Sequence, residues 1–287
     1  MNQSGTRKPK TVRYTAAMPS DVAAEVIANR RLSSDYNVLE LAAPAIAAAA
    51  LPGQFVMIKA GRGRDPLLRR PFSVFEVLRG DNGAPTGISL LNKRIGISTG
   101  LVYAAEPGDR VDCLGPLGRP FSVVEPPAEG WMVAGGVGLA PFAALAEALR
   151  GRGVASVLFY GARSGAELFY LQLFRDLGVE LVLTTEDGSL GERGRVVAPF
   201  ERRLSSQPAG RPVMIYACGP EGMLAATART AARYGRPSQV SVERIMGCGL
   251  GGCYSCVVPM RADPGRFHHV RSCISGPVLP GDQILWD

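Results

Sequence analysis

The chain has 287 residues, of which 46% are hydrophobic and 20% are charged, and its formal net charge is +7 at pH 7. This length predicts two or three domains, and the composition is that of globular proteins, which excludes a wholly disordered chain. The basic residues are scattered, so the charge does not indicate a surface for nucleic acid. The most apolar early run, residues 41–51, is interrupted by Pro44 and is shorter than the ~20 residues of a membrane span. We therefore expect neither a nucleic acid nor a membrane as partner.

The amino terminus is the one locally basic segment. Arg7, Lys8, Lys10 and Arg13 precede the first acidic residue, Asp21. A charged, unpatterned segment of this kind predicts a flexible tail, here over residues 1–22. The apolar run at 41–51 lies too far into the chain for a signal peptide, so we expect a cytoplasmic protein. Structural disulfides are rare in that compartment.

Residues 23–125 show short β-type runs separated by turns. The runs "FVMIKA", "FSVFEVL", "GISLLN" and "RVDCLGPLG" alternate with Gly-, Pro- and Asp-rich stretches such as "RGDNGAPTG". Short strands at this spacing predict an antiparallel sandwich or barrel. The Pro-rich stretch at 123–130 is a plausible linker to the next segment.

Strands and helices alternate over residues 126–237. "WMVAGGVGLAPFAALAEALRGRG" combines an apolar strand, a glycine-rich turn and an amphipathic helix, and similar units follow up to "PVMIYACGP" and "EGMLAATARTAARYG". This alternation predicts a parallel, doubly wound sheet. The last segment, residues 238–287, loses the alternation and is rich in Gly and Cys, which predicts a third, small module.

Four of the six cysteines lie in the last segment. They follow the pattern Cys248-x4-Cys253-x2-Cys256, with Cys273 following after sixteen intervening residues. This is the spacing of plant-type [2Fe–2S] proteins. The glycines in "GCGLGGCYSC" permit tight turns and let backbone N–H groups approach sulfur. The pattern predicts that Cys248, Cys253, Cys256 and Cys273 bind a [2Fe–2S] cluster.

Two alternatives use the same cysteines. A structural zinc site usually has a C-x2-C pair on each side, whereas the second side here offers only Cys273. His268 and His269 precede it, and we interpret them as surface residues. A disulfide knot is disfavoured by the expected compartment, and Cys113 is interpreted as a buried apolar residue.

Two turns in the α/β segment carry a second signal. "VAGGVGLAPF" places glycines between a strand and a helix, where a pyrophosphate can approach the positive helix end. "YACGP" places Cys218 at the carboxyl end of a later strand, the edge at which open α/β sheets bind ligands. The plain alternatives are a tight strand–helix turn and a buried structural cysteine.

Four stretches follow one another along the chain: "LLRRPFSV", "GGVGLAP", "YACGPEGML" and the four-cysteine segment. With these stretches in this order, residues 23–287 resemble the ferredoxin reductase superfamily. More narrowly, the chain resembles the iron–sulfur electron-transfer subunits of class 1B dihydroorotate dehydrogenase. "TTEDGSLGERGRV" and "CISGPVL" are similar to stretches of that family. The resemblance implies an FAD-binding β-barrel at 23–125, an NAD-binding α/β domain at 126–237 and a [2Fe–2S] domain at 238–287.

The resemblance also implies cofactor-binding residues. For FAD these residues lie in the R-P-x-S motif at 70–73, in the segment at 92–94 and in the following turn, where Ser98 replaces a glycine. They are Arg70, Pro71, Phe72, Ser73, Asn92, Lys93, Arg94, Gly96, Ser98 and Thr99. For the nicotinamide nucleotide they are the two turns described above: Gly135, Gly136, Gly138, Pro141, Cys218, Gly219 and Pro220. Cys218 would border the nicotinamide ring, and we assign no catalytic acid or base.

In the resembled family, an FMN-containing catalytic subunit oxidises dihydroorotate, and electrons pass through [2Fe–2S] and FAD to NAD⁺. The resemblance therefore implies this relay, in de novo pyrimidine biosynthesis, and a heterotetramer with two copies of each subunit. The alternative is an NAD(P)H-dependent reductase subunit that serves a hydrogenase, a ferredoxin or an oxygenase. Arg163 and Glu167 follow the second α/β strand, so the sequence leaves NADH and NADPH open. The resemblance favours NAD.

Overall fold

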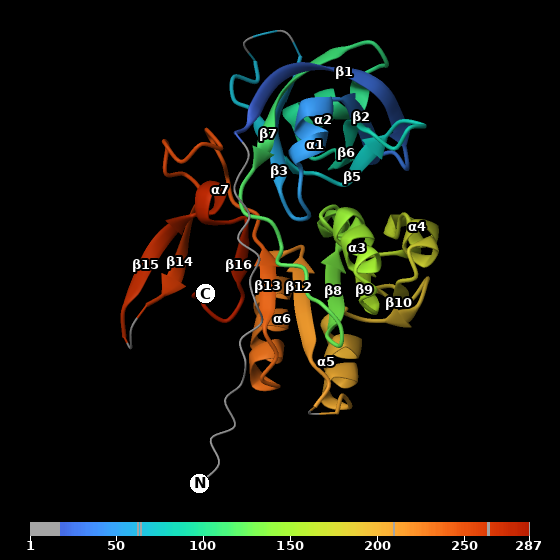
Figure 1. Ribbon diagram of the computed structural model, residues 1–287, viewed down its shortest axis with the longest axis vertical. Coiled ribbons are helices and arrows are strands. Elements are labelled where there is room, and N and C mark those ends of the chain that lie inside the picture. Colours follow the sequence, from blue (N-terminus) through green and yellow to red (C-terminus); the bar gives the residue numbers. More distant parts are fainter. Residues whose placement is uncertain (1–17, 62, 64, 209, 263–264, 287) are drawn as a thin grey trace.

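The computed structural model describes residues 18–286 except 62, 64, 209 and 263–264. Most of the tail expected over residues 1–22 lies outside the described residues. Its last residues belong to a strand, because β1 begins at Ser20. Figure 1 shows a curved antiparallel sheet at the top, a parallel sheet below it and a hairpin to one side.

The first sheet has seven strands in the order β4-β3-β7-β1-β2-β6-β5, and all neighbouring pairs are antiparallel. Its strands are β1 (Ser20–Arg31), β2 (Tyr36–Ala42), β3 (Phe55–Ala60), β4 (Arg70–Ser73), β5 (Glu76–Arg79), β6 (Pro85–Lys93) and β7 (Arg110–Leu117). The short helices α1 (Pro44–Ala49) and α2 (Ile97–Ala104) lie within the curve of this sheet (Figure 1). Alternate residues such as Leu39, Leu41 and Val56 fill the core between them. The expected barrel-type sheet is confirmed.

The second sheet also has seven strands, in the order β11-β10-β9-β8-β12-β13-β16. Its strands are β8 (Glu129–Gly135), β9 (Ser156–Ala162), β10 (Glu180–Thr185), β11 (Glu192–Arg193), β12 (Val213–Cys218), β13 (Ser238–Ser241) and β16 (Val278–Pro280). All pairs are parallel except β13 with β16. The chain runs outward from β8 through β9 and β10, then returns to β12 on the other side of β8. This is the expected doubly wound arrangement.

Helices cover both faces of the parallel sheet. They are α3 (Phe142–Gly151), α4 (Leu171–Asp176), α5 (Val197–Ser205) and α6 (Glu221–Arg233), with two short 3₁₀ turns, η1 (Gly136–Leu139) and η2 (Gly165–Glu167). Met132 packs with α3 and α4, whereas the preceding residue, Trp131, packs with α5 and α6. This alternation follows from the two-residue period of a strand that is buried on both faces. In the described part of the chain, every helix is too short or too polar to span a bilayer.

The C-terminal segment combines a hairpin with strands of the parallel sheet. β14 (Val257–Arg261) and β15 (Phe267–Arg271) form the hairpin, and α7 (Ser272–Ser275) follows. β13 and β16 instead continue the parallel sheet. The boundaries expected after residues 22, 125 and 237 remain proposals, and the last one separates β13 from the sheet that it extends.

Aromatic side chains join the two large sheets into one core. Phe121 follows the first sheet and stacks on Phe142 of α3, with ring centroids 6.0 Å apart. Phe75, between β4 and β5, meets Tyr170 edge-on at 4.7 Å. These buried contacts hold the first sheet against the carboxyl edge of the second, the edge at which such sheets bind ligands.

Candidate functional site

The four cysteines of the last segment lie together in two pairs. The Sγ atoms of Cys256 and Cys273 are 3.3 Å apart and buried. Cys248 and Cys253 interact through their side chains at the outer side of the loop. All six cysteines of the chain are described, and all are free thiols. The loop therefore brings distant Cys273 to the other three without a disulfide.

Backbone N–H groups already point at one sulfur of this loop. The amides of Leu250 and Gly252 donate to Cys248 Sγ at 3.4 and 3.3 Å. Hydrogen bonds of this kind stabilise a thiolate and are typical of the surroundings of iron–sulfur clusters. Gly249 has φ +70°, and a Cβ atom there would lie 2.5 Å from Cγ of Met57. Only glycine fits this close approach between the loop and β3.

The thiols differ in their electrostatic surroundings. Hydrogen bonds from the Ser255 side chain and backbone, and then from Cys248, lower the pKa of Cys253 to about 6. Burial, and then the neighbouring Cys256, raise the pKa of Cys273 to about 12. A buried thiol is a poor thiolate by itself, but a bound metal deprotonates its thiol ligands.

The four thiols fall into two pairs. A two-iron cluster takes two soft sulfur ligands at each iron, so the arrangement supplies the two pairs of ligands that the predicted cluster requires. His268 and His269 are exposed on β15 and pair in register with Met260 and Pro259.

The predicted flavin motif Arg70–Ser73 forms β4, an edge strand of the first sheet. Arg70 is exposed, and its Nη1 donates to the backbone carbonyls of Leu68 and Arg69, at 3.4 and 3.2 Å. The rest of this guanidinium is available for a diphosphate. Pro71 pairs with Met57 of β3, the residue that Gly249 approaches. Met57 therefore has the predicted flavin strand β4 as its neighbour in the sheet and the cysteine loop against its side chain.

The other predicted flavin residues lie at the end of β6 and the start of α2. Asn92 is fully buried, and its Nδ2 donates to Asn37 Oδ1 at 2.7 Å and to the carbonyl of Thr99 at 3.0 Å. Thr99 Oγ1 accepts the amides of Ile95 and Gly96 at 2.9 and 3.0 Å. These two side chains thus hold the turn in shape.

The turn brings further predicted flavin residues together. Ser98 lies in the first turn of α2, whose backbone N–H groups can meet an anion, whereas the amide of the N-cap residue Gly96 is already bonded to Thr99 Oγ1. Lys93 places its ammonium 5.0 Å from the centroid of the Tyr36 ring, and Arg94 pairs with Asp35 at 3.2 Å.

The two glycine turns of the parallel sheet come together at the topological switch point. The first turn starts at Gly135, the last residue of β8, and the second starts at Cys218, the last residue of the neighbouring strand β12. A Cβ on Gly138 would lie 2.3 Å from the carbonyl oxygen of Cys218, so the turns are in backbone contact. Burial raises the pKa of the Cys218 thiol to about 12, so this thiol stays protonated at neutral pH.

Three residues of this region carry no signal in the sequence. Met57 lies inside an ordinary apolar strand, and Arg271 precedes Cys273 without belonging to a spacing motif. Tyr36 of β2 is buried, and its hydroxyl has no hydrogen-bond partner among the described residues. This hydroxyl lies 4.0 Å from the position of a Cβ on Gly136. Their importance follows from contacts between segments distant in the chain.

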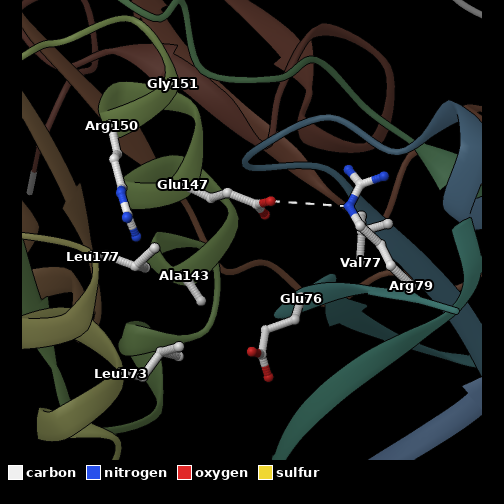
Figure 2. A pocket seen from close by; sticks show the side chains of 9 residues that line it. All are labelled: Glu76, Val77, Arg79, Ala143, Glu147, Arg150, Gly151, Leu173 and Leu177. Atoms are coloured by element: carbon white, nitrogen blue, oxygen red, sulfur yellow. Dashed lines mark ion pairs between the residues drawn. The ribbon is translucent and has the colours of Figure 1, made fainter. Parts of the chain in front are cut away.

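A groove of about 570 Å³ lies away from these residues, between β5 and the helices α3 and α4. Figure 2 shows Arg79 and Glu147 facing each other across it, 4.0 Å apart, with Glu76 below them. None of the predicted cofactor residues lines this groove. It belongs to the packing of the two sheets.

The fold and these sites define a reductase of the ferredoxin reductase type with a C-terminal iron–sulfur module, which implies FAD, an iron–sulfur cluster and NAD as cofactors. Residues 132–229 match the model of the oxidoreductase NAD-binding domain, and residues 243–285 match that of the iron–sulfur cluster binding domain of dihydroorotate dehydrogenase B. The chain belongs to the family of electron transfer subunits of dihydroorotate dehydrogenase B (NAD(+)).

Curated relatives carry this assignment, and solved structures show the same fold. The subunit from Desulforamulus reducens is 36% identical, over 92% of this chain and 98% of its own. The subunit from Fusobacterium nucleatum is 31% identical, over 89% and 95%. The structure of an NADH-dependent reduced ferredoxin–NADP oxidoreductase is 27% identical over 93% of this chain and 91% of its own, with a TM-score of 0.78. The ferredoxin reductase of carbazole 1,9a-dioxygenase, at 24% identity over 78% and 68% with a TM-score of 0.62, shares the fold.

Proposed function

We propose that the chain is the electron-transfer subunit of an NAD-linked dihydroorotate dehydrogenase in pyrimidine biosynthesis. It would link an FMN-containing catalytic subunit to NAD⁺ in the cytoplasm. When bound, a [2Fe–2S] cluster carries single electrons, FAD exchanges single electrons for pairs, and NAD⁺ takes a hydride. The chain's own residues hold these groups and set the distances between them.

The observation that carries this proposal is the junction at Met57. On one side Met57 pairs with Pro71 of the flavin motif. On the other side it packs with Cys256 and Cys273 in one buried cluster and is approached by Gly249. A cluster on the cysteines and a flavin on β4 would then be separated by little more than one strand. Close contact between two carriers is what a relay requires.

The nucleotide site is proposed at the switch point, with NAD rather than NADP. A 2′-phosphate is usually bound by an arginine near the end of the second strand. Here the Arg163 guanidinium is bound to the Glu167 carboxylate, with Nε also 3.3 Å from Oε2. This ion pair lowers the pKa of Glu167, so the carboxylate is ionised at neutral pH. It therefore keeps the Arg163 guanidinium paired and away from a 2′-phosphate.

We propose that the catalytic subunit docks on the exposed face of the cysteine loop. Ile245, Leu250 and Tyr254 are 85, 55 and 62% exposed there, which is unusual for apolar side chains so close together in the chain. Cys253 lies on the same exposed loop. Docking here would bring the partner's flavin next to the cluster, and we expect a complex of two copies of each subunit.

The proposal is tested by anaerobic purification of the chain together with the catalytic subunit encoded in the same genome. We expect iron and FAD in the purified complex, and reduction of NAD⁺ by dihydroorotate. The mass of the complex, measured by light scattering, tests the two-plus-two stoichiometry. A complex that contains both cofactors but does not oxidise dihydroorotate would refute the assigned substrate.

The second candidate is an NAD(P)H-dependent reductase subunit with another acceptor. It is favoured by the similarity to the NADH-dependent reduced ferredoxin–NADP oxidoreductase over nearly the whole chain. Purified protein that transfers electrons from NADH to ferredoxin, and that has no activity with dihydroorotate in the complex, would support it.

A further inference from the structure

Arg271 joins the two parts of the cysteine site. It is the last residue of β15 and directly precedes α7, which contains Cys273. Its Nη1 donates a hydrogen bond of 2.6 Å to the carbonyl oxygen of Gly251. Gly251 lies between Cys248 and Cys253, so one side chain ties the three-cysteine loop to the segment of the fourth cysteine.

The carbonyl that Arg271 binds shares a peptide group with an N–H that binds sulfur. The amide of Gly252 donates to Cys248 Sγ at 3.3 Å. The Gly251–Gly252 peptide is trans, since the cis peptides of the described chain all precede proline. In a trans peptide the C=O and N–H point in opposite directions. Orienting the oxygen toward Arg271 therefore orients the N–H toward the sulfur.

The charge of Arg271 also acts through this peptide. A cation on a carbonyl oxygen forms a strong hydrogen bond and polarises the peptide group. Polarisation makes the N–H at the other end a stronger donor, because hydrogen bonds in a chain strengthen one another. The Cys248 sulfur thus receives a stronger hydrogen bond than an unassisted amide would give.

The same guanidinium holds the next part of the loop. Its central carbon lies 4.7 Å from the centroid of the Tyr254 ring, in cation–π geometry. Tyr254 has φ +59°, which is costly for a residue with a side chain. The stacking compensates for this conformation between Cys253 and Cys256.

We propose that Arg271 is a positioning residue that raises the reduction potential of the cluster through the Gly251–Gly252 peptide. The inference rests on the proposed function, because it requires an iron–sulfur cluster on the four cysteines. Reduction adds negative charge to the sulfur atoms, so a stronger N–H donor and a fixed cation stabilise the reduced state more than the oxidised state.

The test measures the midpoint potential of the cluster in the holoprotein. Iron is quantified first, and EPR then monitors the cluster through an anaerobic potentiometric series. For Arg271→Met we expect the ratio of oxidised to reduced cluster at a fixed potential to rise at least tenfold. This corresponds to a midpoint potential lower by about 59 mV for one electron. Arg271→Gln keeps a donor without charge, and Arg271→Lys keeps the charge without the planar fork, so both should lie between Arg271→Met and the wild type. Arg261→Met, on the exposed end of β14, is the control with the same change in net charge.

The outcomes separate the inference from its alternatives. A wild-type potential in Arg271→Met, or a shift equal to that of Arg261→Met, overturns it. A wild-type potential in Arg271→Lys, with Arg271→Gln equal to Arg271→Met, means a through-space charge effect and overturns the peptide route. If Arg271→Met loses iron, wild-type potentials in both other variants overturn the inference. Wild-type protein without iron refutes the proposed function instead, and is recognised before any variant is compared.

Discussion

Cys248 and Cys113 have contrasting surroundings. Two backbone amides donate to the Cys248 sulfur, and Gly249 beside it has a conformation that lets the loop meet β3. Cys113 is buried in the core of the first sheet, and burial raises its pKa to about 12. The proposed ligand thus meets hydrogen-bond donors, whereas the core thiol meets apolar side chains.

We expect Cys248→Ser to lose most of the bound iron and of the visible absorption of the cluster. A serine hydroxyl is a hard oxygen ligand and is not readily deprotonated, whereas iron in these clusters takes soft sulfur. Iron per polypeptide after anaerobic purification checks this. The control is Cys113→Ala, which should keep its iron, and equal iron in the two variants would contradict the assigned ligands.

At the scale of elements, β3 is the strand on which the sites converge. Its residue Met57 has β4 as a neighbour in the sheet and the cysteine loop packed against its side chain. The cysteine segment and the first sheet share a buried cluster here, made of Phe55, Met57, Leu117, Met246, Cys256 and Cys273. This small core fixes the loop relative to the flavin strand.

Met57→Ala should therefore destabilise the protein and also release the cysteine loop. Removal of a buried Met side chain costs about 2–5 kcal/mol. Met132→Ala is the matched control, because Met132 is equally buried in the parallel sheet, far along the chain from the cysteines. We expect both variants to unfold at lower denaturant concentration, but only Met57→Ala to lose iron faster to a chelator. The same rate of iron loss in both would argue against the junction.

β5 contributes the half-buried carboxyl of Glu76 to the groove between the sheets (Figure 2). Desolvation raises the pKa of Glu76 above its ordinary value of 4.5, against the opposing effects of Ser89 and Arg30, and Glu40 and Glu147 raise it further. Above pH 4.5 the unfolded state gives up this proton more readily than the folded state. This contribution to stability therefore falls as the pH rises from about 4.5 through the raised pKa.

Replacement of Glu76 by Gln should remove this dependence. We expect Glu76→Gln to be more stable than the wild type at pH 8 and to lose this advantage toward pH 4. Denaturant midpoints measured across this range provide the check. Glu147→Gln, on the other side of the groove, controls for the loss of one negative charge. A constant difference between Glu76→Gln and the wild type at all pH values would show that the carboxyl is not desolvated.

At the scale of the whole molecule, the cysteine module and the nucleotide edge lie on different sides of the first sheet (Figure 1). The switch point faces the first sheet from below, whereas the cysteine loop reaches it from the side through β3. Under the proposed function, this arrangement would leave the outer face of the cysteine loop to the catalytic subunit and the switch point to the nucleotide.

Ile245→Asp should weaken the complex with the catalytic subunit without changing the cofactors. Burial of a large aliphatic side chain contributes about 1.5–3 kcal/mol, so its replacement should weaken association about tenfold or more. Ile27, which is exposed on β1, offers the control Ile27→Asp. Light scattering of co-expressed subunits checks the result. An intact complex with Ile245→Asp would place the docking face elsewhere.

The sequence by itself determined the fold class, the order of the modules and the four cysteines as a set. These features are local: strand and helix periods, glycine turns and the x4 and x2 spacings are set by a few neighbouring residues. The likeness of "RRPFSV" and "CISGPVL" to one family added the cofactors and the family. For Asn92 and Thr99, however, the motif alone gave no sign that their side chains hold a turn.

Only the tertiary structure decided how the sites meet. The contact of Gly249 with Met57, the hydrogen bond from Arg271 to Gly251 and the approach of Gly138 to Cys218 join residues far apart in the chain. Such contacts depend on which strands pair and how the sheets pack, so they leave no periodic or spacing signal. The place of β13 and β16 in the parallel sheet was missed for the same reason, because short strands are assigned by their partners rather than by their own residues.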